Sequence, residues 1–430
     1  MLPPGPAEPP AIQTARWLLR PISFMESCRR RFGEAFSVRF LGFSTPMVML
    51  SDPTAIRALY TERRHGLPPG RGVALLPVVG PRSVLLLEGR EHLARRKLML
   101  PPFHGERMRA YEATVRDVVA RDVAAWPRGE AFAVHPRMQA VTLEVIVRAV
   151  FGVTDPVRGE RLRALLRGLL DATASFGLQF GFMLARRVGA PDPLEKLRRQ
   201  RAQIDELLLA EIGERRAAGG GADILSLLLE ARFEDGEPMA DQEVCDQLVT
   251  LLVAGHETTA TALAWTLELL VHHPAALERL GDGSDPAYLK AVIDESLRLR
   301  PVVPLAGRRL ASPLVVDGME LPEGTDVTPA IWLAHTRDDV YGDPFAFRPE
   351  RWLGGDAPPG YAWVPFGGGV RRCLGAAFAE MEMRVALAEI LRHRTLRAAS
   401  EEAERVARRN VTFSPAGGTR VVAVARPGEH

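Results

Sequence analysis

The chain has little cysteine for its length, because only Cys28, Cys245 and Cys373 occur among 430 residues. An odd and sparse set of thiols excludes the disulfide framework of a small secreted protein and is typical of a reducing compartment. No apolar run reaches the roughly 18 residues that a membrane-spanning helix needs. The proline-rich start, residues 1–10, lacks the basic and apolar regions of a secretory signal. These absences predict a soluble, cytoplasmic protein without a membrane anchor.

An excess of charge of one sign is also missing. The 55 Lys and Arg residues nearly balance the 53 Asp and Glu residues, which gives a formal net charge of +2. The overall charge therefore does not indicate a protein that binds nucleic acid or a membrane through its bulk electrostatics.

Helical periodicity dominates from about residue 91 to residue 300, and short strands are predicted on either side of it. Strands alternating with helices, which would build a parallel sheet, are absent. We therefore predict a mainly α fold with minor β, in a single large domain over residues 1–430, with residues 1–10 as a flexible start. The predicted strands before and after the helical region are Ala35–Phe40, Pro46–Leu50, Val315–Val316, Gly318–Leu321, Val411–Phe413 and Arg420–Ala425.

The longest predicted helix runs from Asp241 to His272, just before Pro274. At about 1.5 Å per residue it would be roughly 48 Å long. Since it is apolar almost all round, we expect it at the centre of the molecule. Its middle, residues 254–259, reads Ala-Gly-His-Glu-Thr-Thr. An acid beside an alcohol in a buried helix suggests a proton-transfer pair, but a solvated polar patch with threonines bonded back to the helix explains it equally well.

A glycine-rich segment, residues 366–375, reads Phe-Gly-Gly-Gly-Val-Arg-Arg-Cys-Leu-Gly and precedes a helix predicted from Ala376 to about His393. Glycines let the backbone turn tightly and approach a flat ligand. A cysteine at a helix N-terminus, next to Arg371 and Arg372, is expected to have its thiolate favoured by the helix dipole and by charge. Cys373 is therefore a candidate nucleophile or metal ligand.

The surroundings of Cys373 narrow this choice. A nucleophile would need a histidine base and an oxyanion hole, and a zinc or redox centre would need a second thiol. A phosphate-binding loop would end in Lys-Ser or Lys-Thr. The segment has none of these. A lone thiolate presented by glycines and flanked by arginines suits the axial position of haem, whose propionates need cationic partners. The alternative is a buried structural cysteine in a glycine-rich turn.

The pattern Phe366-x-x-Gly369-x-Arg371-x-Cys373-x-Gly375 resembles the haem-binding signature of the cytochrome P450 family. The resemblance extends from about residue 35 to the end, with Trp352 in place of the usual phenylalanine of one motif. Four further segments are similar to motifs of that family and occur in the same order: His92-x-x-x-Arg96, residues 254–259, Glu295-x-x-Arg298, and residues 347–352.

The resemblance implies a haem-thiolate monooxygenase in which heme b lies between the long central helix and the cysteine-bearing loop. Cys373 would be the fifth ligand of the iron and favour cleavage of the O–O bond. The other cofactor-binding residues that it implies are Phe366, Gly367 and Gly375 in the loop, Ala254 on the central helix, and His92, Arg96, Arg308 and Arg371 at the propionates.

The same resemblance implies catalytic and structural roles. Thr258 would hydrogen-bond the reacting oxygen, and Glu257 would relay protons to it from solvent. Small residues at positions 254 and 255 would leave room for dioxygen and substrate. Glu295, Arg298 and Arg351 would form a buried scaffold, whose disruption by deleting one partner costs about 3–5 kcal/mol.

The positions that would line the substrate pocket are nearly all apolar, and they include Val253, Ala254, Val303 and Phe413 together with Phe176, Phe180 and Phe182. We therefore expect a hydrophobic substrate such as a terpenoid, a fatty acid or a steroid. The chain lacks flavin, nicotinamide and iron–sulfur signatures, so the resemblance implies a monomer that takes electrons from a ferredoxin and its reductase. Arg95, Lys97 and Arg372 are candidate docking residues.

Two other functions stay open at this point. One is a haem-thiolate isomerase, dehydratase or peroxygenase, and the other is a haem-based sensor without catalytic activity. Neither would need the acid–alcohol pair Glu257–Thr258, and a sensor would usually carry an output domain, so the monooxygenase is favoured.

Overall fold

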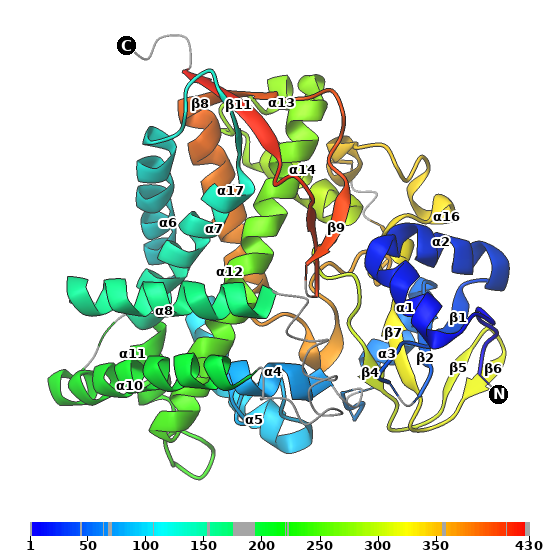
Figure 1. The fold of residues 1–430 in the computed structure, drawn as a ribbon, viewed down its shortest axis with the longest axis horizontal. Coiled ribbons are helices and arrows are strands. Elements are labelled where there is room, and N and C mark those ends of the chain that lie inside the picture. Colours follow the sequence, from blue (N-terminus) through cyan, green and yellow to red (C-terminus); the bar gives the residue numbers. More distant parts are fainter. Residues whose placement is uncertain are drawn as a thin grey trace.

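Helix α12 (Asp241–His272) is the element around which the other helices of the computed structural model are arranged (Figure 1). It spans 32 residues, which confirms the long helix predicted from the sequence. Helices α7, α10, α14 and α17 all pack against it. Because its neighbours cover nearly every side, residues such as Leu248, Leu263 and Trp265 are fully buried, which explains why the helix is apolar almost all round.

The structure describes residues 2–43, 45–62, 64–67, 71–105, 107–152, 155–174, 194–219, 221, 223–354, 358–409 and 411–425. Helices make up most of these residues, as predicted. In chain order, the α-helices other than α12 are α1 (Pro10–Leu19), α2 (Pro21–Phe32), α3 (Pro53–Thr61), α4 (Arg71–Val79), α5 (Gly89–Met99), α6 (Arg107–Ala124), α7 (His135–Ile146), α8 (Pro156–Ala174), α10 (Glu195–Ala218), α11 (Ile224–Glu230), α13 (Pro274–Leu280), α14 (Pro286–Leu299), α15 (Ile331–His335), α16 (Asp338–Tyr341) and α17 (Ala376–His393).

Shorter helical turns connect several of these helices. The 3-10 turns are η1 (Pro101–Phe103), η3 (Pro349–Trp352) and η4 (Gly369–Arg371), and a π-helical turn, η2 (Val147–Phe151), follows α7 directly. Turns η3 and η4 contain residues of two motifs predicted to matter, so irregular backbone rather than regular helix presents them.

The strands form small sheets at the periphery. The largest has the order β1-β2-β7-β4, in which β2 and β7 are parallel and the other pairs are antiparallel. A second sheet has the order β3-β11-β8, and two hairpins, β5-β6 and β9-β10, complete the set. Their bounds are β1 (Ala35–Val38), β2 (Met47–Leu50), β3 (Ala131–Ala133), β4 (Arg308–Arg309), β5 (Leu314–Val316), β6 (Met319–Leu321), β7 (Asp326–Pro329), β8 (Arg394–Ala398), β9 (Val406–Arg409), β10 (Thr412–Pro415) and β11 (Arg420–Ala425).

The buried side chains divide into one large and two small clusters. The large cluster surrounds α12 and includes residues of α6, α7, α14 and α17. A second lies between α3 and the β1-β2-β7 face, and a third joins α1 and α2 to β1 and β10. The N-terminal elements therefore have a core of their own beside the helical body, on the right of Figure 1.

The proline-rich start, predicted to be flexible, makes contacts with β1 and α1. Pro3 is buried, and the carbonyl oxygen of Pro4 accepts a hydrogen bond of 3.0 Å from the amide of Ser37 in β1. The side-chain amide of Gln13 donates from Nε2 to the carbonyl oxygens of Pro6 and Glu8. Since proline has no N–H group, its carbonyls are the backbone groups left to anchor such a segment.

No helix among the described residues is long and apolar enough to cross a membrane.

Candidate active site

The loop before α17 holds Cys373 in a closed turn. The amide of Cys373 donates a hydrogen bond of 2.9 Å to the carbonyl oxygen of Phe366, so the two ends of the loop meet. Gly367 and Gly369 have φ values of +66° and +65°, a region that favours glycine. A Cβ atom at Gly369 would overlap the carbonyl oxygen of Tyr60 in α3. The glycines are therefore needed for both the turn and the close approach of α3.

The protonation of Cys373 differs from the sequence-based expectation. Burial raises the pKa of its thiol, and the amide of Gly375 and the guanidinium groups of Arg372 and Arg96 lower it by less. Cys373 is nevertheless exposed to solvent. The predicted stabilisation of the thiolate by dipole and charge is present, but desolvation outweighs it.

Three arginines meet around His92 of α5. Burial, followed by the charges of Arg371, Arg96 and Arg308, lowers the pKa of His92 to about 4. These residues come from α5, β4 and η4, so they are far apart in sequence and close in space. Burial, together with Arg308 and Arg96, lowers the pKa of Arg371 to about 10, although Glu88 opposes this. The structure therefore assembles the four residues that the sequence assigned to propionate binding.

The backbone holds two of these arginines. Arg308 is buried, donates from Nη1 to the carbonyl oxygen of Gly307 at 2.9 Å, and lies over the ring of Tyr60 at 5.1 Å from its centroid. Arg371 donates from Nη2 to the carbonyl oxygen of Leu87 at 2.5 Å. None of Arg96, Arg308 and Arg371 forms a salt bridge with a described residue. Like charges collected in a partly buried site repel one another, and carboxylates of a bound group would relieve that repulsion.

The polar centre of α12 presents two different faces. On one face Ala254 is exposed and Thr258 is half-buried, and the hydroxyl of Thr258 donates to the carbonyl oxygen of Ala254 at 2.6 Å. On another face Glu257 is directed toward α7. There the side-chain amide of Gln139 donates to Oε2 of Glu257 at 2.6 Å. The back-bonded threonine of the alternative interpretation is present. The polar centre is not a solvated patch, however, because His256 is buried and its Nδ1 lies 2.9 Å from the hydroxyl of Thr142.

Glu257 has further polar neighbours that sequence reasoning missed. Its Oε1 lies 3.7 Å from Nε2 of His135 and 3.9 Å from Nε of Arg409 in β9. This Oε1 atom is buried without a hydrogen-bond partner in the part of the chain that the structure describes. His135, Gln139 and Thr142 lie four and three residues apart, and so share one face of α7. The spacing of these three polar residues along one face of α7 was the signal that could have revealed them.

Gly255 serves packing rather than space for substrate. A Cβ atom there would come within 2.8 Å of Cδ1 of Ile146, at the end of α7. The predicted role of position 255 in leaving room for dioxygen therefore does not fit its direction, whereas Ala254 is exposed as that role requires.

A buried ion network lies at the end of α14. Arg298 donates from Nε and Nη2 to the two carboxylate oxygens of Glu295, each at 2.7 Å, and both side chains are fully buried. Arg351 donates from Nε to Oε1 of Glu295 at 2.9 Å, and the indole of Trp352 donates to Oε2 at 3.0 Å. Burial alone raises the pKa of Glu295, but Arg298, the amide of Arg348 and the charge of Arg351 hold this pKa below its ordinary value. The three residues predicted as scaffold are thus in contact.

His335 connects this network to the cysteine loop. The amide of Val364, just before the loop, donates to Nε2 of His335 at 2.8 Å. Nε2 is therefore the acceptor, and Nδ1, 3.2 Å from the carbonyl oxygen of Arg298, carries the proton. Burial and the charge of Arg298 lower the pKa of His335 to about 3, in agreement with a neutral ring.

The residues predicted to line the substrate pocket separate in the structure. Val253 and Val303 are partly buried against the large cluster around α12. Phe413 is a correction, because its side chain is buried in the N-terminal cluster, with its ring 6.0 Å from that of Trp17. The backbone of β10 fixes this direction, since the carbonyl oxygen of Phe413 accepts from the indole of Trp265. Phe176, Phe180 and Phe182 lie outside the described residues.

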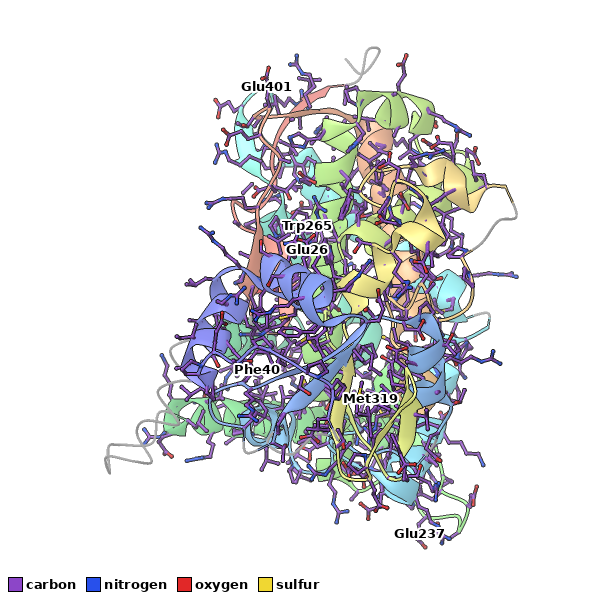
Figure 2. All side chains as sticks on the ribbon, turned by 90° about the vertical axis from the view of Figure 1, so that its right-hand side faces the viewer. Glu26, Phe40, Glu237, Trp265, Met319 and Glu401 are labelled. Atoms are coloured by element: carbon purple, nitrogen blue, oxygen red, sulfur yellow. The ribbon has the colours of Figure 1, made fainter. Side chains whose placement is uncertain are left out.

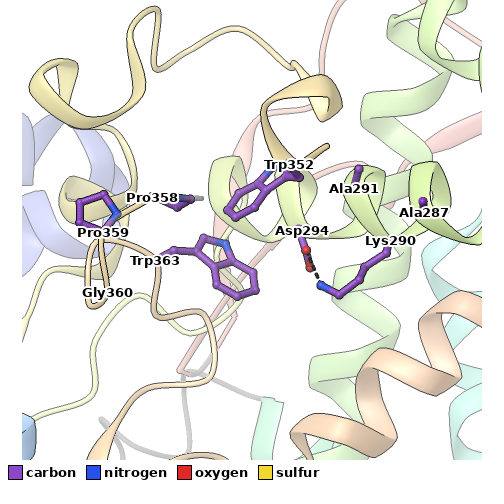
Figure 3. A pocket seen from close by; sticks show the side chains of 9 residues that line it. All are labelled: Ala287, Lys290, Ala291, Asp294, Trp352, Pro358, Pro359, Gly360 and Trp363. Atoms are coloured by element: carbon purple, nitrogen blue, oxygen red, sulfur yellow. Dashed lines mark hydrogen bonds and ion pairs between the residues drawn. The ribbon is translucent and has the colours of Figure 1, made fainter. Parts of the chain in front are cut away.

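A surface hollow of about 410 Å³ lies between α14 and residues 358–363 (Figure 3). The rings of Trp352 and Trp363 form one wall, and the ion pair of Lys290 and Asp294 lies opposite. None of the residues assigned to the thiolate site or the substrate pocket lines it. We therefore do not regard it as the place where a substrate would react.

Two of the candidate docking residues are engaged within the chain. Arg95 forms a half-buried salt bridge of 2.7 Å with Glu243, and Lys97 pairs with Glu234 at 2.9 Å. Arg372 is exposed. Lys97 and Arg372 both lie on the surface, and of the three residues Arg372 is the one without a salt bridge to a described residue.

Comparison with known proteins gives a consistent result. The family model described as cytochrome P450 matches residues 3–416. Cytochrome P450 135B1 of Mycobacterium tuberculosis is 40% identical over 435 aligned residues, which cover 98% of this chain and 91% of that protein. Cytochrome P450 137 of the same species is 39% identical over 399 residues, covering 91% and 83%.

Solved structures agree with this result. The retinoic acid-bound cyanobacterial CYP120A1 superposes with a TM-score of 0.85 at 25% identity and covers 99% of each chain. The heme domain of cytochrome P450DA has a TM-score of 0.86 at 23% identity, with 99% and 98% covered, and this shows the shared fold.

The fold and these relatives define the class of the protein as a haem-thiolate enzyme. The chain belongs to the cytochrome P450 family. It is accordingly a monooxygenase that uses heme b and O2, and the cation cluster around His92 has the chemistry that heme propionates require.

The contact between the cysteine loop and α3 gives a first prediction. Replacing Gly369 by alanine would force a side chain into a left-handed position and against Tyr60, so we expect a loss of about 2 kcal/mol or more in the free energy of unfolding. Gly354→Ala is the control, because no described neighbour lies within 4 Å of a Cβ atom there. Its effect should stay within about 0.5 kcal/mol. Urea denaturation of both variants measures this, and equal effects would contradict it.

The buried network gives a second prediction. Arg298→Met leaves the buried carboxylate of Glu295 without its main cationic partner. This change should lower the free energy of unfolding by about 3–5 kcal/mol. Arg279→Met removes a surface pair with Glu350, whose side chains are 48% and 49% exposed. That change should cost about 1 kcal/mol or less. A similar loss in both variants would show that burial does not set the strength of the Arg298 pair.

Proposed function

We propose that this monooxygenase inserts one oxygen atom into a hydrophobic small molecule of moderate size, of the terpenoid, fatty acid or steroid class. The observation that carries the assignment of the reacting centre is the convergence of Arg96, Arg308 and Arg371 around His92, combined with Cys373 in its glycine loop. The apolar character of Val253, Ala254 and Val303 supports the substrate class. The bound retinoic acid of the cyanobacterial CYP120A1 shows that one similar protein accepts a hydrophobic ligand.

The proposed haem-binding residues divide the work between them. Cys373 would hold the haem iron through its sulfur, and the charge of the metal would favour the thiolate form that burial alone disfavours. His92, Arg96, Arg308 and Arg371 bind the propionates through charge-assisted hydrogen bonds. Gly367 and Gly375 shape the loop, and Phe366 closes it by accepting the hydrogen bond from the Cys373 amide. When bound, heme supplies the activation of O2.

Proton delivery is assigned to α12. The hydroxyl of Thr258 donates its proton to the carbonyl oxygen of Ala254 and therefore presents its oxygen as an acceptor on the open face of α12, and the carboxylate of Glu257 collects protons from the side of β9. Burial and the charge of Arg409 lower the pKa of His135 to about 4, so His135 stays neutral and does not neutralise Glu257. Gln139 orients the carboxylate through Oε2 and leaves Oε1 to exchange protons.

We further propose a ferredoxin and its reductase as the source of electrons, with Arg372 on the docking face. A monomer in the cytoplasm suits the cysteines, since Cys28, Cys245 and Cys373 are all free thiols.

The assignment of Cys373 is tested by the absorbance difference between the dithionite-reduced protein with and without carbon monoxide. The wild-type protein should give the red-shifted Soret band of a thiolate-ligated haem. Cys373→Ser should lose this band and any product formation, while Cys245→Ser, a buried cysteine of α12, should keep both. An unchanged spectrum in Cys373→Ser would refute the assignment.

The role of Gln139 is tested by measuring how much product is formed for each NADPH consumed. With a terpenoid, fatty acid or steroid that shifts the haem absorbance, Gln139→Leu should divert NADPH to hydrogen peroxide and lower product per NADPH by about tenfold. Glu257→Gln should behave similarly. Gln203→Leu, on the exposed side of α10, serves as the control. Normal coupling in Gln139→Leu, with Glu257→Gln impaired, would remove Gln139 from the relay and leave the relay itself intact.

A further inference from the structure

The imidazole of His272 lies between two carbonyl oxygens at the end of α12. Its Nδ1 is 2.9 Å from the carbonyl oxygen of Glu268, one helical turn earlier, and its Nε2 is 3.1 Å from the carbonyl oxygen of Ser400. A carbonyl oxygen can only accept a hydrogen bond, and a neutral imidazole can donate only one. In the neutral ring a nitrogen lone pair would therefore face one of these oxygens, whereas the protonated ring donates to both.

A buried carboxylate beside the ring favours the same protonated form. Oε1 of Glu268 is 3.5 Å from Nδ1 of His272, and the side chain of Glu268 is 1% exposed. This Oε1 accepts a hydrogen bond of 3.1 Å from the amide of Glu404, and Oε2 is buried without a hydrogen-bond partner in the part of the chain that the structure describes. A buried charge of this kind costs free energy unless an opposite charge lies next to it. The protonated ring of His272 supplies that charge.

The other charges near Glu268 do not replace this partner. Arg300 of α14 acts on Glu268 electrostatically, but the two side chains form no salt bridge within the described chain. The carboxylate of Glu404 accepts from the amides of Gly417 and Thr419 at 2.9 Å each, so it is engaged on the side of β11. Apart from the imidazole, no described cation lies within salt-bridge distance of the Glu268 carboxylate.

The position of His272 also favours a positive charge. It is the last residue of α12, where the helix dipole attracts a cation. Glu401 and Glu402, which follow Ser400 in the facing segment, are exposed acids. The neighbouring His273 is directed elsewhere, since its Nδ1 lies 2.7 Å from the carbonyl oxygen of Leu269. The side chain of His272 is 18% exposed, so solvent reaches it.

The facing segment, residues 399–405, is irregular backbone between β8 and β9. In Figure 2 Glu401 marks this segment at the upper end of the molecule, and Glu237, which precedes α12, lies at the lower end. Strand β9 follows directly, and its Arg409 lies 3.9 Å from Glu257. The bonds to the end of α12 thus hold the start of the strand that reaches the polar centre of the same helix.

We call Glu268, His272, Ser400 and Glu404 the His272 clasp. We propose that the His272 clasp is a pH-sensitive switch, which holds residues 399–405 on α12 while the imidazole is protonated and releases them when the proton passes to solvent. Histidine changes its charge between about pH 5 and pH 8. Because the held form binds the proton more tightly than the released form, it gains stability as the pH falls and loses stability as the pH rises. The proposal goes beyond the monooxygenase activity and depends neither on the substrate nor on the assigned haem ligands.

Hydrogen exchange of the full-length, haem-loaded protein, measured by mass spectrometry on peptides that contain Glu404, tests the proposal. The protection of these amides is the exchange rate of an unstructured peptide at the same pH divided by the rate in the protein. In the wild type this protection should fall about tenfold between about pH 5 and pH 8. His272→Gln, which is neutral throughout, should show weak protection without this pH dependence.

Glu268→Gln separates the charge of the carboxylate from its hydrogen bond. The amide oxygen of the new side chain can still accept from the amide of Glu404, but the counter-charge of the imidazole is gone. We therefore expect protection to fall at a pH about one unit lower than in the wild type.

The matched control is His273→Gln, because this histidine is adjacent, bonds to the last turn of α12 and packs its ring 4.9 Å from that of Phe347. It should keep the pH dependence of the wild type. The carbon monoxide difference spectrum of each variant is recorded in parallel. A missing thiolate band in the wild type would contradict the proposed function, while the exchange result would still report on the His272 clasp.

Three outcomes would overturn the proposal. The first is protection of the 399–405 amides in the wild type that does not change between about pH 5 and pH 8. The second is the same pH dependence in His272→Gln as in the wild type, or an equal loss in His273→Gln. The third is an unchanged transition in Glu268→Gln, which would show that the buried carboxylate does not set the charge of the ring.

Discussion

The buried carboxylate of Glu295 is the constraint on which the rest of the site depends. A charge without contact to water has to be satisfied on all sides, and Arg298, Arg351 and Trp352 supply the donors. The network extends from the carbonyl oxygen of Arg298 to His335. The ring of His335 in turn accepts a hydrogen bond from the amide of Val364, just before the cysteine loop. A polar interaction in the core thus fixes irregular backbone that has no sheet or long helix to hold it.

The cation cluster has the opposite energetic character. Arg96, Arg308 and Arg371 surround a buried, neutral His92, and each guanidinium raises the cost of the others. Helices and strands that are fixed by packing hold these residues together, so the free energy of packing offsets the repulsion between the guanidinium groups. An anionic group that binds there stabilises the folded state, because binding to the native state alone shifts the folding equilibrium. Binding of an anionic group at this cluster would therefore be coupled to the stability of the fold.

The polar residues at the middle of helix α12 point in two different directions. Its Ala254 and Thr258 face is open, whereas Glu257 and the neighbouring His256 bond to α7. The 100° rotation between consecutive residues of an α-helix makes this division unavoidable for an adjacent acid and alcohol. The acid is consequently reached from the side of α7 and β9, and its polar neighbours there decide how it is oriented.

The sequence by itself determined the family, the mainly α architecture, the central helix, the cysteine loop and the residues of the ion network, because these depend on local periodicity and on residue types with few alternative uses. Tertiary structure alone decided what depends on direction and surroundings. It directed the side chain of Phe413 toward the N-terminal core and packed Gly255 against α7. It also attached the proline-rich start to β1 and placed Gln139 beside Glu257. It further raised the pKa of the Cys373 thiol, because burial of the sulfur outweighs the favourable amide and arginine contacts that the sequence predicted.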